Sequence, residues 1–368
     1  MKKFGSSLLL AAAVIVIVGG LFALVKHPHA IIIGSGDANA TSSTSPAKPA
    51  LPTTVDAAAY NAKLLSIANL TIKEHVTRIK ATTSTPSSTI ITTSTIPFGW
   101  PAKAPLPLTG ALLPFNRIVA YYGNFYSTAM GILGEYPEQE VLAKLASTTA
   151  EWQQADPSTP VIPAIQYIAV TAQGSPQKDG TYRARMPDSQ IDKALAMAAQ
   201  IHGVVFLDVQ VGLSSVEKEV PLLEQYLKMP QVNLAIDPEF AMHNGARPGT
   251  VIGSMDATDV NFVANYLAGL VRANNLPPKI LVVHRFTQAM VMNAQNITPL
   301  PEVQIVMDMD GFGPPDQKLT TYRDFIQSEP VQFTGFKLFY KNDARAGHLL
   351  TPAEVLKVSP QPSYIQYQ

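Results

Sequence analysis

Acidic residues recur at the ends of three short apolar runs in this sequence. The runs finish as Phe206–Gln210, Ala235–Glu239 and Val303–Asp310, and a fourth run ends at His284. Neighbouring carboxyl groups raise one another's pKa, and a carboxyl that keeps its proton near neutral pH can act as a general acid. The pattern therefore predicts acid–base chemistry, with these candidate catalytic residues: Glu239, Asp237, Asp310, Asp308 and Asp208.

The spacing within each run predicts which way these side chains point. Side chains alternate between the two faces of a strand, so Asp237 and Glu239 share a face, as do Asp308 and Asp310. A carboxylate turned toward a layer of aliphatic side chains would cost several kcal/mol without a partner. We therefore expect the carboxyls to face a common polar mouth. There Asp237 should stay charged, while burial and its neighbours raise the pKa of Glu239.

Other polar and aromatic residues occur near the same run ends. Aromatic rings with a polar tip suit the faces of sugar rings, and a lysine inside a strand can neutralise carboxylates or extend toward solvent. The predicted substrate-binding residues are Tyr122, Tyr167, Gln210, His284, Lys337 and Tyr340.

The elements that must position these residues are short apolar, β-branched runs. We expect strands at Arg117–Tyr122, Val161–Tyr167, Gly203–Val209, Val232–Asp237, Thr250–Ser254, Lys279–His284, Val303–Asp308 and Gly335–Tyr340.

Amphipathic stretches separate most of these strands. Asp188 and Asp256 each precede such a stretch, as N-cap residues do. The expected helices are Glu138–Gln154, Asp188–Ile201, Val216–Lys228, Asp256–Asn274, Gln288–Asn296, Lys318–Ser328 and Pro352–Lys357.

Eight strands alternating with helices predict an α/β fold of the (β/α)8 TIM-barrel type, with the polar mouth at the carboxyl ends of the strands. An open doubly wound sheet would carry a glycine-rich turn after its first strand, and the sequence YYGNFYSTAMG does not match one. The fifth strand is the weakest, so a count of seven stays open.

The N-terminus predicts a membrane anchor. Leu8–Val25 has no charged residue and approaches the roughly 20 residues that a membrane-spanning helix needs. Lys2 and Lys3 precede it, which predicts a single pass with the following chain outside the cytoplasm. The alternative is a cleaved signal peptide and a secreted protein.

Two Ser/Thr/Pro-rich segments, Thr41–Thr54 and Ala81–Pro97, bury too little apolar surface to fold. Val55–Lys80 between them has apolar residues at helical spacing. The predicted division is a signal anchor at 1–40, a low-complexity stalk at 41–113 with a helix within 55–80, and a barrel at 114–368.

Composition excludes several classes of protein. The 368 residues include 27 basic and 27 acidic ones, so no basic excess is present to bind nucleic acid. The absence of cysteine removes disulfides, thiol catalysis and iron–sulfur clusters. We predict neither an organic cofactor nor a resident metal.

Several segments together resemble a family of exported bacterial proteins, many of them lipoproteins and without an assigned activity. They are FLDVQVG, LAIDPEF, LVVHRFT, DMDGFG and GFKLFYKND. The resemblance implies an extracytoplasmic TIM barrel, although this chain lacks the cysteine that carries a lipid in that family.

More distantly, the barrel is similar to glycoside hydrolases, in which two carboxyl groups flank the glycosidic bond. Many such barrels place them after strands four and seven, which implies Glu239 with Asp308 or Asp310. Others place an Asp-x-Glu pair at one strand end, as in Asp237-Pro-Glu239.

Three functions follow as hypotheses. The first is a membrane-anchored, extracytoplasmic glycosidase that acts on cell-surface polysaccharide, with Glu239 as the acid and Asp310 or Asp208 as its partner. The second is a non-catalytic barrel that binds a glycan or another surface polymer. The third is a metal-assisted hydrolase in which His284, Asp208, Asp237 and Asp310 hold magnesium or calcium.

Overall fold

The structure is a computed structural model that describes residues 54–69, 73–77, 89–93 and 97–368. The predicted membrane anchor and part of the predicted stalk lie outside these ranges. Within them, no helix combines the length and the apolar character needed to cross a bilayer.

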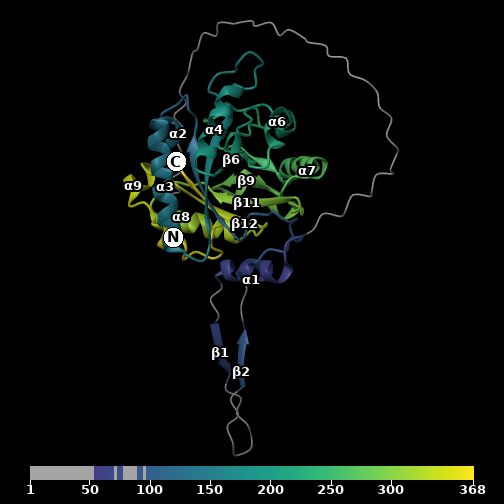
Figure 1. The fold of residues 1–368 in the computed structure, drawn as a ribbon, viewed down its shortest axis with the longest axis vertical. Helices are drawn as coiled ribbons and strands as arrows, with labels where there is room; N and C mark the ends of the chain where they lie inside the picture. Colours follow the sequence, from purple (N-terminus) through teal and green to yellow (C-terminus); the bar gives the residue numbers. More distant parts are fainter. Residues whose placement is uncertain (1–53, 70–72, 78–88, 94–96) are drawn as a thin grey trace, which may run out of the picture.

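Eight parallel strands close into a barrel in the described part of the chain (Figure 1). Each strand pairs with the next, and the last pairs with the first. The predicted barrel is therefore confirmed. Its strands are β3 (Arg117–Gly123), β4 (Val161–Ala172), β6 (Val204–Val209), β7 (Val232–Ile236), β9 (Lys279–Arg285), β11 (Val303–Met309), β12 (Phe333–Leu338) and β13 (Tyr364–Tyr367).

Short strands outside the barrel form three further pairings. β5 (Arg183–Arg185) runs antiparallel to the end of β4. β8 (Met255–Asp256) pairs with β10 (Val291–Met292), and β1 (Lys73–Thr77) pairs with β2 (Thr89–Thr93).

Helices surround the barrel and fill most connections between its strands (Figure 1). The α-helices of the barrel unit are α2 (Ile132–Glu135), α3 (Glu138–Ala155), α4 (Asp188–Gln200), α5 (Val216–Glu219), α6 (Glu224–Leu227), α7 (Ala257–Asn274), α8 (Pro315–Tyr322), α9 (Asn342–Ala346) and α10 (Pro352–Val355). Shorter 3-10 turns are η1 (Pro97–Gly99), η2 (Val220–Leu223), η3 (Pro238–Phe240), η4 (Gln288–Met290) and η5 (Ala294–Asn296), and η6 (Arg323–Gln327) is a π-helix.

The predicted fifth strand at 250–254 is wrong. This segment lies against the turn that carries Glu239, where Gly253 N–H donates to Glu239 O at 2.7 Å. Val251 and Ile252 are exposed, so the apolar run does not face a core. The eighth barrel strand is instead β13, at the extreme C-terminus.

Several predicted helices differ from those observed. The helix expected at 216–228 is divided into α5, η2 and α6, because Pro221 has no N–H to donate within a helix. The segment 288–296 forms η4, β10 and η5 instead of a helix. Asp256 caps α7 through a capping box, as expected, whereas Asp188 is the first residue of α4 and makes no cap.

The alternation of strand side chains separates two apolar layers. Val119, Leu207 and Leu281 belong to the large cluster shared with the surrounding helices. Residues one position away, such as Ile118, Phe206 and Val282, form a second cluster inside the barrel. The period of two expected for strands flanked by helices is therefore present.

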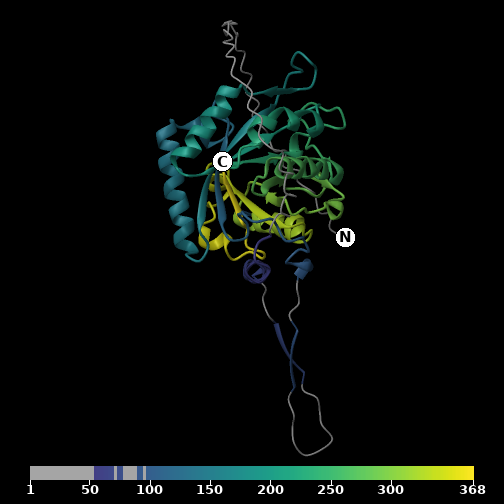
Figure 2. The same ribbon diagram turned by 45° about the vertical axis from the view of Figure 1, so that its right-hand side comes forward.

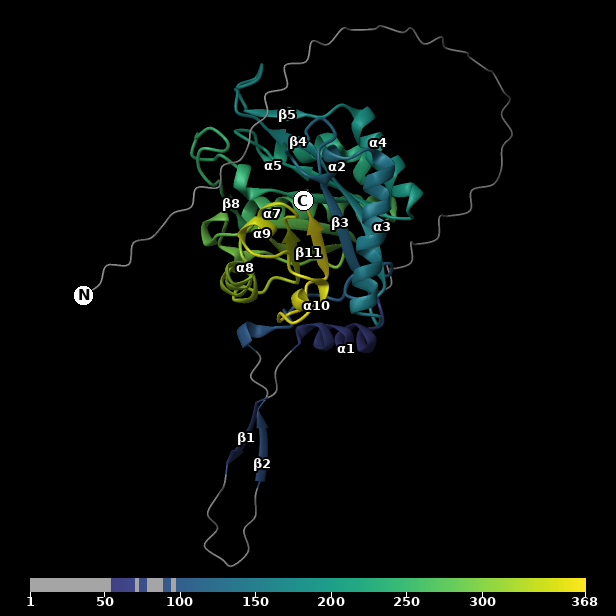
Figure 3. The same ribbon diagram turned by 90° about the vertical axis from the view of Figure 1, so that its left-hand side faces the viewer.

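The N-terminal described residues close the floor of the barrel. Helix α1 (Ala57–Ala68) crosses beneath the strands and is seen nearly end-on in Figure 2 and from the side in Figure 3. Its Tyr60 and the nearby Leu113 belong to the cluster inside the barrel. Gln304 accepts hydrogen bonds from the backbone N–H groups of Leu112 and Leu113 at 3.0 and 3.1 Å. The expected domain boundary at residue 114 therefore lies within this floor, and the helix expected within 55–80 ends at Ala68.

Gly335 provides space for one of the candidate catalytic residues. It lies in register between Asp308 on β11 and Tyr364 on β13. A Cβ at this position would lie 2.4 Å from Asp308 Oδ1 and 3.0 Å from the Tyr364 ring. The Asp308 carboxyl thus occupies the space that a side chain at position 335 would fill.

We predict that Gly335→Ala lowers the free energy of unfolding by about 1–3 kcal/mol, because it overpacks the barrel interior. Gly269 in α7 is the matched control, since a Cβ there meets no atom within 4 Å. Gly269→Ala should raise stability by about 0.5–1 kcal/mol. Urea denaturation of both variants measures the difference, and equal effects would contradict the steric argument.

Candidate active site

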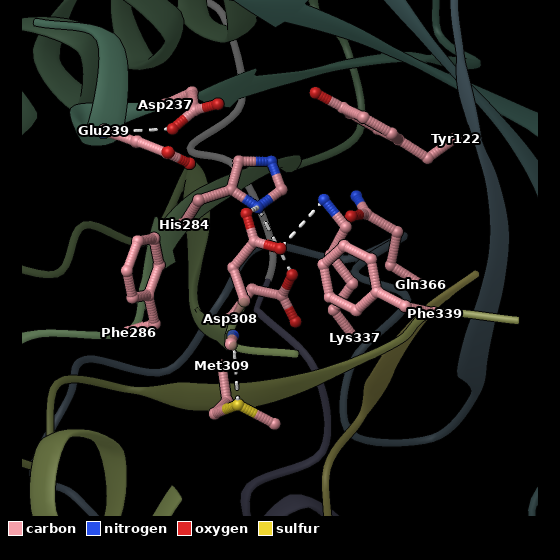
Figure 4. Close-up of polar contacts among 12 residues, drawn as sticks. Tyr122, Asp237, Glu239, His284, Phe286, Asp308, Met309, Lys337, Phe339 and Gln366 are labelled. Atoms are coloured by element: carbon pink, nitrogen blue, oxygen red, sulfur yellow. Dashed lines mark hydrogen bonds and ion pairs between the residues drawn. The ribbon is translucent and has the colours of Figure 1, made fainter. Parts of the chain in front are cut away.

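The carboxyl ends of five neighbouring strands bring the candidate catalytic residues together. Asp208 lies on β6, Asp237 directly follows β7, Glu239 lies in η3, and Asp308 and Asp310 lie at the end of β11. His284 of β9 and Lys337 of β12 complete the group, which we call the mouth cluster. Figure 4 shows His284 between the Asp237–Glu239 pair and Asp308.

His284 connects carboxyls from two sides of the barrel. Its Nε2 lies 2.9 Å from Asp208 Oδ2, and its Nδ1 lies 3.3 Å from the Oδ2 atoms of both Asp308 and Asp310. Burial disfavours the charged imidazole, but the charge of Asp310 and the contacts with Asp208 and Asp308 outweigh it. They hold the pKa of His284 well above its usual range. His284 is therefore a buried imidazolium that links three carboxyls.

Lys337 supplies the second positive charge of the mouth cluster. Its Nζ lies 2.8 Å from Asp310 Oδ1 and 4.0 Å from the centre of the Tyr122 ring. The side chain is 3% exposed, so the ion pair is shielded from solvent. The sequence left open whether this lysine neutralises carboxylates or extends toward solvent, and the structure supports neutralisation.

Neutral polar side chains hold the deeper part of the cluster in place. Gln166 Nε2 donates to Asp208 Oδ2 at 2.6 Å, and Gln166 Oε1 accepts from the Tyr364 hydroxyl. Gln366 Nε2 donates to Tyr364 Oη at 3.2 Å. Sequence reasoning missed these three residues: Gln166 is the single amide in an apolar run, and the last strand was not recognised.

The turn after β7 places two carboxyls next to each other. Asp237 Oδ1 caps η3 by accepting from Glu239 N–H at 3.0 Å, and Gln210 Nε2 donates to Asp237 Oδ2 at 3.3 Å. Pro238 occupies the first position of η3, where its missing N–H has no cost. This short turn gives Asp237 and Glu239 a defined relation at the rim.

Both carboxyls of this turn hold their protons to unusually high pH. Burial, followed by the charges of Asp237 and Asp310, raises the pKa of Glu239 to about 8. The expected direction for Glu239 is confirmed. Burial also raises the pKa of Asp237 to about 7, against the opposing effect of His284. The expectation that Asp237 stays fully charged is therefore wrong.

The charge balance of the cluster explains these shifts. Five carboxyls share the mouth with two cations, His284 and Lys337. Burial raises the pKa of Asp308 as well as those of Asp237 and Glu239, so all three carboxyls bind a proton more readily than free carboxyls do. The remaining two, Asp208 and Asp310, make the shortest contacts to the two cations.

Exposure separates the carboxyls that a ligand can reach from those that it cannot. Asp208 and Asp308 are 0% exposed, Asp237 is 2% and Asp310 is 7% exposed. Glu239 is only partly buried. A molecule entering from solvent therefore meets Glu239 first and then Asp310.

Two of the predicted substrate-binding residues lie elsewhere. Tyr167 belongs to the layer between strands and helices and stacks on Phe125 with ring centres 4.7 Å apart. Tyr340 packs against Tyr121 and Tyr367, also outside the barrel. Tyr167 follows the inward-facing Gln166 on β4 and so points outward, and Tyr340 lies beyond the end of β12. The other four predicted residues lie in the mouth: Tyr122, Gln210, His284 and Lys337.

The expected placement of carboxyls after strands four and seven requires correction. Because 250–254 is not a barrel strand, β11 is the sixth strand of the barrel and β12 is the seventh. The seventh strand presents Lys337. Glu239 and Asp310 therefore come from strands four and six.

The arrangement does not favour the metal-assisted alternative. Within the described ranges, no three His, Asp or Glu side chains are placed to hold an ion together. Both ring nitrogens of His284 already face carboxylates, so neither is directed at a shared metal position.

Comparisons with known proteins do not assign this chain to a family. No protein-family profile and no curated protein sequence matches the chain. One matching solved structure is a ruminal GH26 endo-beta-1,4-mannanase, 11% identical with a TM-score of 0.34. The match covers 69% of this chain and 59% of the mannanase chain, so it spans less than two thirds of that protein. The strand pairings, and not this likeness, establish the barrel.

We predict that stability falls as pH rises from about 4.5 to 8. In this window the unfolded chain releases carboxyl protons that folded Asp237 and Glu239 retain, so the folded state binds more protons. Glu239→Gln should reduce the loss by at least about 1.4 kcal/mol, the equivalent of one pKa unit. Urea denaturation at pH 5 and pH 8 measures it.

The exposed Glu217→Gln provides the control and should leave the pH dependence unchanged. The wild-type slope by itself is not decisive, because His284 also loses stabilisation as pH rises. A Glu239→Gln slope equal to that of wild type would contradict the raised pKa of Glu239.

Proposed function

We propose that the mouth cluster is the active site of a glycoside hydrolase that acts on cell-surface polysaccharide. Protonated Glu239 gives its proton to the glycosidic oxygen as that bond breaks. Asp310 either attacks the anomeric carbon or takes a proton from the attacking water. In the first route the ionised Glu239 then takes a proton from a water molecule that attacks the anomeric carbon and breaks its bond to Asp310. In the second route Asp310 releases its extra proton to solvent, and Glu239 takes up a proton from solvent.

The observation that carries this proposal is the combination of properties at Glu239. Its pKa is raised to about 8, and it is the least buried residue of the five. A general acid needs both a proton at neutral pH and contact with the leaving group. Asp208, the other partner considered for Glu239, is fully buried and bonded to Gln166 and His284. Asp310 is therefore the better partner.

The competing proposal is a barrel that binds a glycan without cleaving it. Tyr122, Gln210 and the carboxyls of the mouth also offer the hydrogen-bonding groups that such a site uses. This alternative predicts retention of the polysaccharide without release of new reducing ends. It becomes the better description if Glu239 can be replaced without effect on binding and no product forms.

We predict that the full chain releases reducing ends from a bacterial cell-wall or capsular polysaccharide and that Glu239→Gln lowers kcat by about 10²–10⁴-fold. The amide retains the size of the carboxyl but has no acidic proton. Glu217→Gln is the matched control and should retain activity. Equal activity of Glu239→Gln and wild type would remove Glu239 from the mechanism.

The full chain is the appropriate protein for this assay. Tyr60 of α1 is buried inside the floor of the barrel, and a fragment starting near residue 98 would lose it.

We propose further that the chain is anchored by residues 8–25 with the barrel outside the cytoplasm, where its polymer substrate lies. The apolar run and the preceding lysines support this location. The barrel should remain with the membrane fraction after a high-salt wash and be digested by protease added to intact spheroplasts. Recovery in the culture medium would instead support the cleaved, secreted form, and protection from the protease would contradict an external barrel.

A further inference from the structure

The ion pair between Asp310 and Lys337 lies beyond the last hydrogen-bonded residues that join its two strands. The pairing of β11 with β12 ends at Met309 and Phe336. Asp310 N–H is held on the other side, by Arg285 O at 3.1 Å. The ladder between β11 and β12 therefore does not set the distance from Asp310 to Lys337.

Lys318 of α8 bridges the gap that the ladder leaves. Its Nζ donates to Gly311 O and to Lys337 O, each at 2.7 Å. The side chain is 1% exposed and also lies 5.4 and 5.2 Å from the ring centres of Phe336 and Phe339. One buried ammonium thus joins the residue after Asp310 to the backbone of Lys337.

Asp343 of α9 completes the bridge from the segment that follows β12. Its Oδ2 lies 3.0 Å from Lys318 Nζ and accepts from Phe339 N–H at 2.9 Å. Its Oδ1 accepts from Gly313 N–H at 3.0 Å. The carboxylate is 0% exposed, so both loops that leave the strands are tied to a single buried ion pair.

We propose that Lys318 and Asp343 form a positioning pair that fixes Asp310 against Lys337. Neither side chain belongs to the mouth cluster, and neither touches the carboxyls that a ligand reaches. Their bonds are to the backbone on both sides of the Asp310–Lys337 contact, which is where a positioning role requires them.

The electrostatic environment of Lys318 is consistent with this role. Burial lowers its pKa to about 8, against the opposing effects of Asp343, Asp310 and Asp308. The mouth carboxylates therefore interact with Lys318 although they make no direct bond to it.

The test is the reactivity of Lys337 in the folded protein. In the double variant Lys318→Met/Asp343→Asn the net charge is unchanged and the bridge is lost. We expect the rate of reductive methylation of Lys337, followed by mass spectrometry of the full chain, to rise about tenfold. The single variant Asp343→Asn leaves Lys318 with both carbonyls and should give a smaller rise, and it serves as the test if the double variant does not fold.

The matched control is a buried ion pair at the opposite end of the barrel. Arg117 Nη1 lies 3.0 Å from Asp156 Oδ2 at the start of β3. Arg117→Met/Asp156→Asn should lower stability and leave the methylation of Lys337 at the wild-type rate. An unchanged rate in the Lys318 and Asp343 variants, or an equal rise in the control, would overturn the positioning role.

This inference rests on the proposed function only for the part that Asp310 plays in catalysis. The methylation assay contains no substrate. Failure to find a cleaved polysaccharide would not contradict the positioning pair. An unchanged methylation rate of Lys337 in the variants would not contradict the assignment of Glu239.

Discussion

The charge imbalance inside the barrel mouth is the constraint on which the rest of the structure depends. Five carboxyls face two cations in a space that water scarcely enters, and unpaired buried charge costs several kcal/mol. The structure meets this cost in two ways. His284 and Lys337 contact Asp208 and Asp310 closely, while burial raises the pKa values of Asp237, Glu239 and Asp308. Burial thus raises the pH at which several carboxyls of the cluster lose their protons.

Keeping such a cluster together requires support from the layer around it. Arg285, beside His284 on β9, turns outward and donates to Phe325 O and Gln288 O at 3.1 Å each, as well as to Glu329. Lys318 acts similarly on the far side of β11. Arg285 thus ties the end of β9 to the surrounding layer, and Lys318 binds the carbonyls of Gly311 and Lys337. The mouth is therefore fixed by main-chain contacts made outside the barrel, and Gly335 leaves the internal space that Asp308 needs.

Sequence patterns predicted those parts of this arrangement that depend on local periodicity. The apolar, β-branched runs predict seven of the eight barrel strands. Alternation along these runs predicts that the carboxyl pairs point inward. Alternation along β4 could also have excluded Tyr167, which directly follows the inward-facing Gln166. The segment 250–254 has a strand-like composition, but its place is decided by contact with the Glu239 turn. β13 is a four-residue strand whose pairing with β12 and β3 is entirely non-local, and so Tyr364 and Gln366 were missed. The pairing partners of Lys318 depend on loops that no local pattern describes.

The position of Glu239 distinguishes a catalytic role from a purely structural role for a carboxyl with a raised pKa. A buried carboxyl with a raised pKa, such as that of Asp308, can serve the fold alone, because it has no contact with solvent. Glu239 differs, since it is partly accessible and yet its pKa is raised to about 8 by burial and by Asp237 and Asp310. The Asp237 cap and the hydrogen bond from Gly253 hold the backbone of Glu239 in place at the rim. Glu239 is therefore the carboxyl residue of raised pKa that a ligand from solvent can reach. When Glu239 ionises, its new charge is repelled by the neighbouring carboxyls. Proton transfer is therefore favourable only when the ligand oxygen gains more from the proton than this repulsion costs. That difference between ground state and transition state distinguishes a general acid from a residue that only binds.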